Sequence, residues 1–268
     1  MHAFKAFLMK KKLLLLCCCA LTSSAYSQTP RLTDRNTLGW FVYSGDHRVT
    51  EKWAVHTEYQ WRRMNWVRAP QQQLARLGVV HTLSQRVEAS GGYTYFQTHR
   101  YGEYPTVPNR PEPEHRLYED ISLADKLGRV SLTHRIRLEQ RWLGTRAREG
   151  QGRVQEWAYQ NRIRYQLSGQ YPLKGAAVDD GEWYVNAFDE LFMGFGRNVG
   201  NNVFNQNRLS GGLGYQFTSN AKVELNYLFQ ISQHATPEPA SQRPVFEINN
   251  GFRLNVLYDL DLTHGKAL

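Results

Sequence analysis

The stretch Val130-Ser-Leu-Thr-His-Arg-Ile-Arg-Leu-Glu-Gln-Arg-Trp142 decides the fold, because mostly apolar and mostly polar side chains alternate along it. Successive side chains of a β-strand point to opposite faces, so a period of two over this length predicts a strand and argues against a helix. One face carries Leu132, Ile136 and Trp142, and the other carries charged groups. The sequence therefore predicts a strand with one apolar and one charged face.

The same alternation recurs along the chain, most clearly at residues 53–62, 156–167 and 223–231. These strands run about 10–14 residues, whereas strands of soluble proteins usually run about five or six and a tilted strand needs about ten to cross a bilayer. The pattern thus favours strands that span a membrane. Further strands with less regular alternation are expected at residues 38–44, 72–83, 87–98, 114–123, 182–193, 205–217 and 245–260.

Aromatic side chains mark two levels on the apolar faces. Trp53 and Trp61 lie eight residues apart, as do Trp157 and Tyr165. At ~3.3 Å per residue this spacing covers roughly 26 Å of strand, or about 20 Å of height after a tilt of ~40°. Outer-membrane barrels carry an apolar band of about that height between two aromatic girdles. The residues predicted to face lipid or to lie in the girdles are Trp53, Tyr59, Trp61, Ile136, Trp142, Trp157, Tyr165 and Phe229.

The predicted connections alternate in length. Short turns are expected at 44–47, 83–86, 124–128 and 218–220, with a connection of middling length at 168–181. Longer loops are expected at 64–71, 99–113, 143–154, 194–204 and 232–244. Short periplasmic turns and longer outer loops are typical of bacterial outer-membrane barrels. We therefore predict an all-β fold: a single antiparallel transmembrane β-barrel of about 10–12 strands over residues 28–268.

The strand count raises one difficulty. Eleven strands can be counted, whereas bacterial single-chain barrels normally have an even number. Either the barrel has a twelfth strand that shows no clear alternation, or the segment 38–44 is not a full strand of the wall.

The N-terminal segment has the features of an export signal. A basic stretch at Lys10–Lys12 precedes a short apolar core at Leu13–Leu21, and Ala25-Tyr26-Ser27 offers small residues for cleavage. The core is shorter than the roughly 20 residues that span a bilayer. Residues 1–27 are therefore predicted to be a cleaved signal peptide of a Gram-negative-type envelope protein. Outer-membrane lipids and the barrel-assembly machinery are then the expected partners. A lipoprotein is the alternative, but Leu16 precedes Cys17 where a lipidation signal needs a small residue.

Composition narrows the chemistry. The chain has three cysteines, all within the predicted signal, so no disulfide is expected in the mature protein. Removing the signal leaves 29 cationic and 24 acidic side chains, a net charge of +5, and most of the cations are arginine. The cations are spread among glutamates without forming long runs, which argues against a nucleic-acid partner.

The charged strand faces are the main candidate site. They are predicted to line the barrel lumen. If carboxylates pair with the arginines, the lumen of a narrow barrel is filled and the protein has a structural or loop-display role. If arginine remains in excess, the barrel is a narrow anion-favouring pore. The predicted ladder comprises Arg135, Arg137, Glu139, Arg141, Glu156, Arg162, Arg164, Glu58 and Glu224, with Glu190 and Glu247 within reach across the lumen.

The sequence gives less support to three other classes of protein: a lipid hydrolase, a metal-binding protein and a soluble binding module. A lipid hydrolase needs a nucleophile beside a histidine, but His134 and Ser131 lie on opposite faces, and His81 with Ser84 lies at a short turn. The acidic pairs at 179–180 and 259–261 lack calcium-loop spacing. We predict no catalytic, metal-binding or cofactor-binding residue and no enzymatic activity. A soluble periplasmic β-sandwich binding module is the rival fold, in which the aromatic faces would pair across two sheets.

Several segments resemble one protein family. They are residues 116–120, 127–141, 162–165, 184–192, 207–215 and 225–228. Together they are similar to the bacterial envelope family called domain of unknown function 2490, in the family's order and over nearly all of the mature chain. The resemblance implies an outer-membrane-type barrel. It implies no activity, and no catalytic residue is carried over from it.

Overall fold

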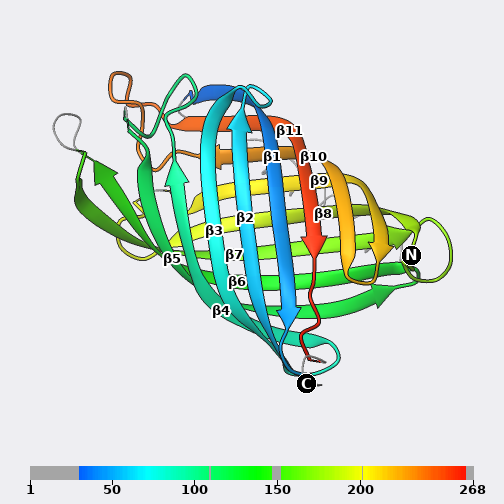
Figure 1. The fold of residues 1–268 in the computed structure, drawn as a ribbon. Coiled ribbons are helices and arrows are strands. Elements are labelled where there is room, and N and C mark those ends of the chain that lie inside the picture. The colour runs from blue at the N-terminus through cyan, green and yellow to red at the C-terminus, as the bar shows by residue number, and fades with distance from the viewer. Residues whose placement is uncertain (1–29, 109, 147–151, 201, 264–268) are drawn as a thin grey trace, which may run out of the picture.

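The computed structural model describes residues 30–263 except 109, 147–151 and 201, and this part of the chain consists mostly of β-strands. The predicted signal peptide lies outside the described residues. Among those residues no helix is long and apolar enough to cross a membrane. The strands, shown in Figure 1, are β1 (Leu32–Arg48), β2 (Trp53–Met64), β3 (Ala69–Thr82), β4 (Val87–Thr98), β5 (Glu112–Leu127), β6 (Val130–Arg146), β7 (Val154–Pro172), β8 (Glu182–Phe195), β9 (Phe204–Thr218), β10 (Ala221–Gln233) and β11 (Val245–Tyr258).

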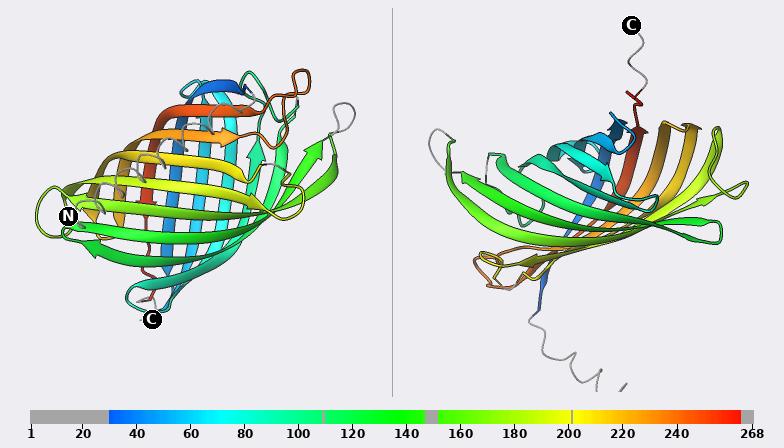
Figure 2. Two further views of the ribbon diagram at one scale, coloured as in Figure 1. Left: turned by 180° about the vertical axis from the view of Figure 1, so that it is seen from behind. Right: turned by 90° about the horizontal axis from the view of Figure 1, so that it is seen from below.

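The strands form one closed barrel in which each pairs with its neighbours in the chain. The ring closes where β1 meets β11, and this pair is parallel, running from Leu32 opposite Val245 to Ser44 opposite Leu257. In Figure 1 the arrows of β1 and β11 point the same way, and Figure 2 shows the strands curving around the barrel. The all-β barrel prediction is confirmed. The two-sheet sandwich is excluded, because a single sheet closes on itself.

The barrel has an odd number of strands. Eleven strands agree with the count from the sequence, and the expectation of an even number is wrong. The segment 38–44 is part of a full strand, β1, which pairs with both β2 and β11. The turn predicted at 44–47 is also wrong, because the alternation continues to Arg48 and the chain reverses at 49–52. There the Val49 amide donates to the carbonyl of Trp53 at 2.9 Å.

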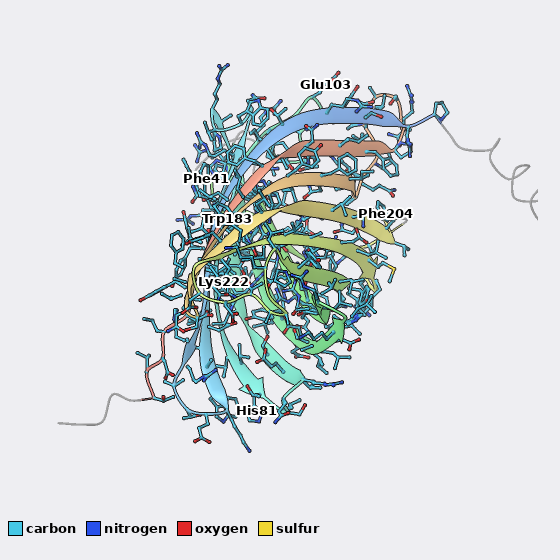
Figure 3. The ribbon with its side chains drawn as sticks, turned by 90° about the vertical axis from the view of Figure 1, so that its right-hand side faces the viewer. Phe41, His81, Glu103, Trp183, Phe204 and Lys222 are labelled. Carbon is cyan, nitrogen blue, oxygen red and sulfur yellow. The ribbon has the colours of Figure 1, made fainter. Side chains whose placement is uncertain are left out.

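Other connections also differ from the prediction. β7 continues to Pro172, so the connection expected at 168–181 begins at residue 173. The loop expected at 64–71 is a tight turn of residues 65–68, in which Asn65 and Trp66 take positive φ angles of 48° and 67°. The turn expected at 124–128 lies at 128–129, where Gly128 has φ of 60°. Most of the longer connections lie at one end of the barrel, here called the loop end, and the other end, here called the turn end, carries short turns and the nine-residue connection 173–181. Glu103 and His81 mark these two ends in Figure 3.

The wall has two different faces. One cross-strand row on the outside contains Ile121, Ile136, Tyr165 and Leu191. Ile121 is 58% exposed and Ile136 is 54% exposed. The next row, one residue away on each strand, faces the lumen and is mostly charged; it contains Asp120, Arg137, Arg164 and Phe192. The outward apolar row and the inward charged row thus both follow from the period of two in the sequence.

The lumen is partly filled by apolar side chains. A cluster of buried residues packs inside the wall, with Ala69 and Tyr101 against it; it consists of Leu38, Trp40, Met64, Phe188 and Leu228. Trp40 is 1% exposed, and its indole nitrogen donates to Gln71 Oε1 at 2.9 Å. The inside of the barrel therefore has a packed core on the side of β1.

Glycines on the wall make room for inward tyrosines. Tyr184 is fully buried and lies over Gly214, where an added Cβ would come 2.2 Å from its ring carbon Cζ. Gly214→Ala is therefore expected to destabilise the folded barrel by about 1–3 kcal/mol through overpacking. Gly211→Ala is the matched control, because its Cβ would meet nothing closer than 3.6 Å. Urea unfolding in detergent measures both, and equal losses would contradict the packing argument.

Candidate functional site

The lumen carries a network of arginines and carboxylates built by strand register. On β6, Arg135, Arg137, Glu139 and Arg141 follow one another at every second position. Glu139 lies opposite Arg162 of β7, and Arg137 lies opposite Arg164. Charged side chains at every second position of one strand therefore lie beside charged side chains of the next strand.

Two glutamates form the centre of this network. Glu139 is 1% exposed and accepts hydrogen bonds from Arg162 Nε and Arg164 Nη1, both at 2.7 Å. Glu190, also 1% exposed, accepts from Arg164 at 2.5 Å, Arg135 at 3.0 Å and Arg208 at 3.3 Å. Since Arg164 is shared, a continuous chain of ion pairs links β6, β7, β8 and β9.

Further ion pairs extend the network around the ring. Glu114 accepts from Arg116 at 2.6 Å and from Arg141 at 2.5 Å. Asp120 pairs with Arg137, and Glu58 pairs with Arg76. Among the residues that the structure describes, eight lumen arginines thus share five carboxylates: Arg76, Arg116, Arg135, Arg137, Arg141, Arg162, Arg164 and Arg208 with Glu58, Glu114, Asp120, Glu139 and Glu190.

Aromatic rings hold the guanidinium groups in place. The Cζ atom of Arg116 lies 4.1 Å from the centre of the Phe96 ring, and that of Arg164 lies 4.5 Å from the centre of the Phe192 ring. Such cation–π contacts suit the planar, weakly hydrated guanidinium. The arginines are therefore fixed by packing as well as by charge.

Two predicted ladder residues lie apart from the ion pairs. Glu156 is exposed at the start of β7, opposite Thr145, because this hairpin extends past the level of the network. Glu224 is buried, but it accepts from the Tyr184 hydroxyl at 3.0 Å and from Asn255 Nδ2 at 2.8 Å. The structure brings the other predicted ladder residues together.

Sequence reasoning missed several members of the network. They are Arg76, Glu114, Arg116, Asp120 and Arg208. The signal was present on β5, where Glu114, Arg116 and Asp120 share one parity opposite Leu117 and Ile121. Extending the alternation argument to the less regular strands would have found them.

The predicted girdle residues lie on the outside of the wall. Most are exposed: Trp53, Tyr59, Trp61, Ile136, Trp157 and Tyr165. Trp142 and Phe229 are half-buried. The Trp142 ring lies 5.3 Å from that of Tyr159, which explains its lower exposure.

The histidines considered for catalysis contact aromatic side chains. His134 Nδ1 lies 2.8 Å from the Tyr165 hydroxyl on the outer face. The His81 ring stacks on Trp53 with 4.1 Å between ring centres. The described residues contain no group of three or more His, Cys, Asp or Glu side chains placed to hold a metal ion.

One long connection folds into the loop end of the barrel. In the segment 99–111 between β4 and β5, the amides of Glu103 and Tyr104 donate to Asp34 Oδ2 at 3.0 and 3.3 Å. The Tyr101 hydroxyl donates to Glu247 at 3.3 Å. Burial and the neighbouring Glu247 carboxylate raise the pKa of Tyr101 well above its ordinary value, so this phenol stays a neutral donor.

A cavity of about 740 Å³ lies among these groups. The inserted segment contributes Tyr101, Thr106 and Val107 to its wall, and the strands contribute arginines, amides and phenylalanines. The lumen is therefore obstructed by side chains and by a loop, yet it retains a polar space of small-molecule size.

Fold and lumen together define the class: a closed β-barrel with an apolar outer surface and an interior crowded with paired charges. Residues 37–241 match the family described as "Protein of unknown function (DUF2490)", and the chain belongs to this family. A solved structure of OmpT (in-vitro folded), an outer membrane protein of Vibrio cholerae, is similar at 13% sequence identity with a TM-score of 0.34. That similarity covers 73% of this chain and 56% of the OmpT chain, so it spans little more than half of that protein. A comparison with curated proteins found no match.

Proposed function

We propose that the protein is an integral outer-membrane β-barrel with a closed lumen and a structural or loop-display role. One observation carries this: the same strands turn large apolar side chains outward and bury their arginines and glutamates inside. A protein folded in water buries apolar groups in preference to charges. A barrel in lipid has its apolar face outside and satisfies all backbone hydrogen bonds by closing.

The contents of the lumen support the closed state. Ion pairs centred on Glu139 and Glu190 cross four strands, and the cluster around Trp40 fills the side near β1. The segment 99–111 obstructs the loop end. We also propose that the protein is not an enzyme, because His81 and His134 contact aromatic rings on the outer wall. Outer-membrane lipids and the barrel-assembly machinery are its proposed partners.

Fractionation tests the membrane assignment. Since the outer face is apolar around the ring, the protein is expected to remain with the outer-membrane fraction after an alkaline wash. It should also migrate faster on a gel before boiling than after, because closed barrels resist unfolding in detergent. Complete release into the soluble fraction would overturn the proposal.

A narrow anion-favouring pore is the second candidate, and a specific observation favours it. Of the residues that the structure describes, ten arginines and six glutamates line the 740 Å³ cavity: Arg62, Arg76, Arg116, Arg135, Arg137, Arg141, Arg162, Arg164, Arg208 and Arg253 with Glu58, Glu112, Glu114, Glu190, Glu224 and Glu247. The lumen therefore has an excess of positive charge near an internal space, as the lining of an anion pore does.

Conductance in a planar bilayer separates these two functions. The closed barrel is expected to show no channel, either in the wild type or in the double variant Arg135→Ala, Arg137→Ala. An anion-selective current that falls in the double variant would establish the pore in place of the closed barrel. The two arginines are suitable targets because both line the cavity.

A further inference from the structure

Three adjacent strands present a row of two arginines and a tryptophan to the lumen. Trp40 of β1 lies opposite Arg253 of β11 on one side and opposite Arg62 of β2 on the other. The Cζ atom of Arg62 lies 3.9 Å from the centre of a Trp40 ring, and that of Arg208, from β9, lies 4.9 Å from it. Two guanidinium groups thus lie over one buried indole, and the Cζ atom of Arg253 lies 5.5 Å from the centre of the Phe188 ring.

This cluster is poorly neutralised. Arg62 is 7% exposed, and its hydrogen bonds go to amide oxygens, Gln60 Oε1 and Gln72 Oε1, both at 2.8 Å. Among the described residues, neither Arg62 nor Arg253 has a carboxylate oxygen within 4.0 Å. Arg208 has one long contact, 3.3 Å to Glu190.

Among the described residues, the neighbouring carboxylates form no ion pair with Arg62 or Arg253. Glu190 is shared by three arginines. Glu224 accepts from Tyr184 and Asn255, and Glu247 accepts from Tyr101 and Asn249. Removing a cation from water without a counter-charge is costly, so a bound anion would stabilise this part of the lumen.

Polar atoms beside the cluster offer further contacts. Asn186 Nδ2 and Arg253 Nε are buried donors that have no partner among the described residues. Asn186 is 6% exposed, and it lines the cavity together with Arg62, Arg208 and Arg253. Phe188 and Phe192 line it as well, so the donors stand beside an apolar wall.

We infer that these four residues (Arg62, Asn186, Arg208 and Arg253), here called the arginine pocket, bind the oxyanion of a small molecule, a carboxylate or phosphate. Planar guanidinium groups bind such oxyanions through paired hydrogen bonds. A cavity of about 740 Å³ admits a metabolite-sized anion. The pocket faces the lumen, so its ligand is a free anion from solution and not the headgroup of a lipid around the wall.

Binding to the full barrel folded in detergent tests this inference. Citrate and inorganic phosphate, each compared with chloride at equal ionic strength, are titrated by calorimetry and by thermal unfolding. At least one oxyanion is expected to bind saturably and to raise Tm. Arg62→Gln and Arg253→Gln are expected to raise its Kd about tenfold or more, because each removes a charged, paired donor.

Arg63→Gln is the matched control. It removes the same charge one residue from Arg62, but the half-buried Arg63 guanidinium lies 5.0 Å from the centre of the outward-facing Trp61 ring and donates to the carbonyls of Val67 and Arg68. Its Kd should equal that of the wild type. Absence of saturable binding by both oxyanions, or an equal loss in Arg63→Gln, would overturn the inference.

A charge-preserving variant covers the case in which a Gln variant does not fold. Arg253→Lys keeps the cation but loses the paired donors, so a severalfold rise in Kd is expected and an unchanged Kd would overturn the inference. These measurements use detergent and need no membrane location. Their failure is therefore distinct from a failure of the proposed function, which is read from fractionation and conductance.

Discussion

Glu190→Gln is expected to lower the free energy of unfolding by about 3–5 kcal/mol, because it leaves buried guanidinium groups without their carboxylate. Glu190 is 1% exposed and contacts Arg135, Arg164 and Arg208. Of these, Arg164 keeps a second partner in Glu139. Arg135 and Arg208 have no other carboxylate contact among the described residues, so both lose their ion-pair partner in this variant. Urea unfolding in detergent micelles, followed by tryptophan fluorescence, measures the change.

Glu156→Gln is the matched control for this experiment. It makes the same chemical change at an exposed site near the loop end, outside the ion-pair network. Its effect should stay within about 0.5 kcal/mol, as for other surface substitutions. If both variants lost the same stability, the network would have no special part in holding the barrel.

Ile136→Arg is expected to cost about 2–4 kcal/mol in a lipid bilayer, because it places a charge on the side of the wall that faces lipid in the proposed membrane placement. Ile136 is 54% exposed and stands between Ile121 and Tyr165 on the neighbouring strands. Thr133→Arg on the same strand should cost much less, since Thr133 is exposed and lines the lumen cavity. Reversible unfolding in lipid vesicles compares the two variants.

The same two variants can also be compared by unfolding in detergent. The penalty at Ile136 should shrink where the surrounding medium is thin or deformable, whereas the Thr133 variant should be insensitive to the medium. Equal penalties in vesicles would show that the two parities of β6 do not face different environments.

Most of the fold could be predicted because the alternation is a local property. Each strand shows its two faces in its own residues, and β6 alone gives the outward and inward sets. The errors arose where local signals competed. Gly45 and Asp46 favour a turn, yet Ser44, Asp46 and Arg48 keep the inward parity, and the pairing with β2 continues to Arg48.

The parallel pairing of β1 with β11, which closes the ring, could not be predicted, for a different reason. Pairing between β1 and β11 joins residues more than two hundred positions apart, such as Leu32 and Val245. No periodicity within either strand specifies its partner or its direction.

For the candidate site, contacts between neighbouring strands could be predicted and contacts between more distant strands could not. The meeting of Glu139 with Arg162 follows from two consecutive strands of matching parity. Contacts that skip strands, such as Arg135 with Glu190, require the radius and register of the closed ring. The segment 99–111 is held in the barrel by hydrogen bonds to Asp34, which is distant in sequence. The proline-rich composition of this segment does not predict whether it folds into the barrel or away from it.

The parallel seam gives the molecule a polarity that a barrel with an even number of strands lacks. Because the number of strands is odd, the first strand starts at the loop end and the last strand finishes at the turn end. In the proposed membrane placement, a peptide joined ahead of Leu32 would be displayed outside the cell, and one joined after the last strand would stay in the periplasm. A single chain could then carry a reporter in each compartment, and a protease added to whole cells would remove only the first.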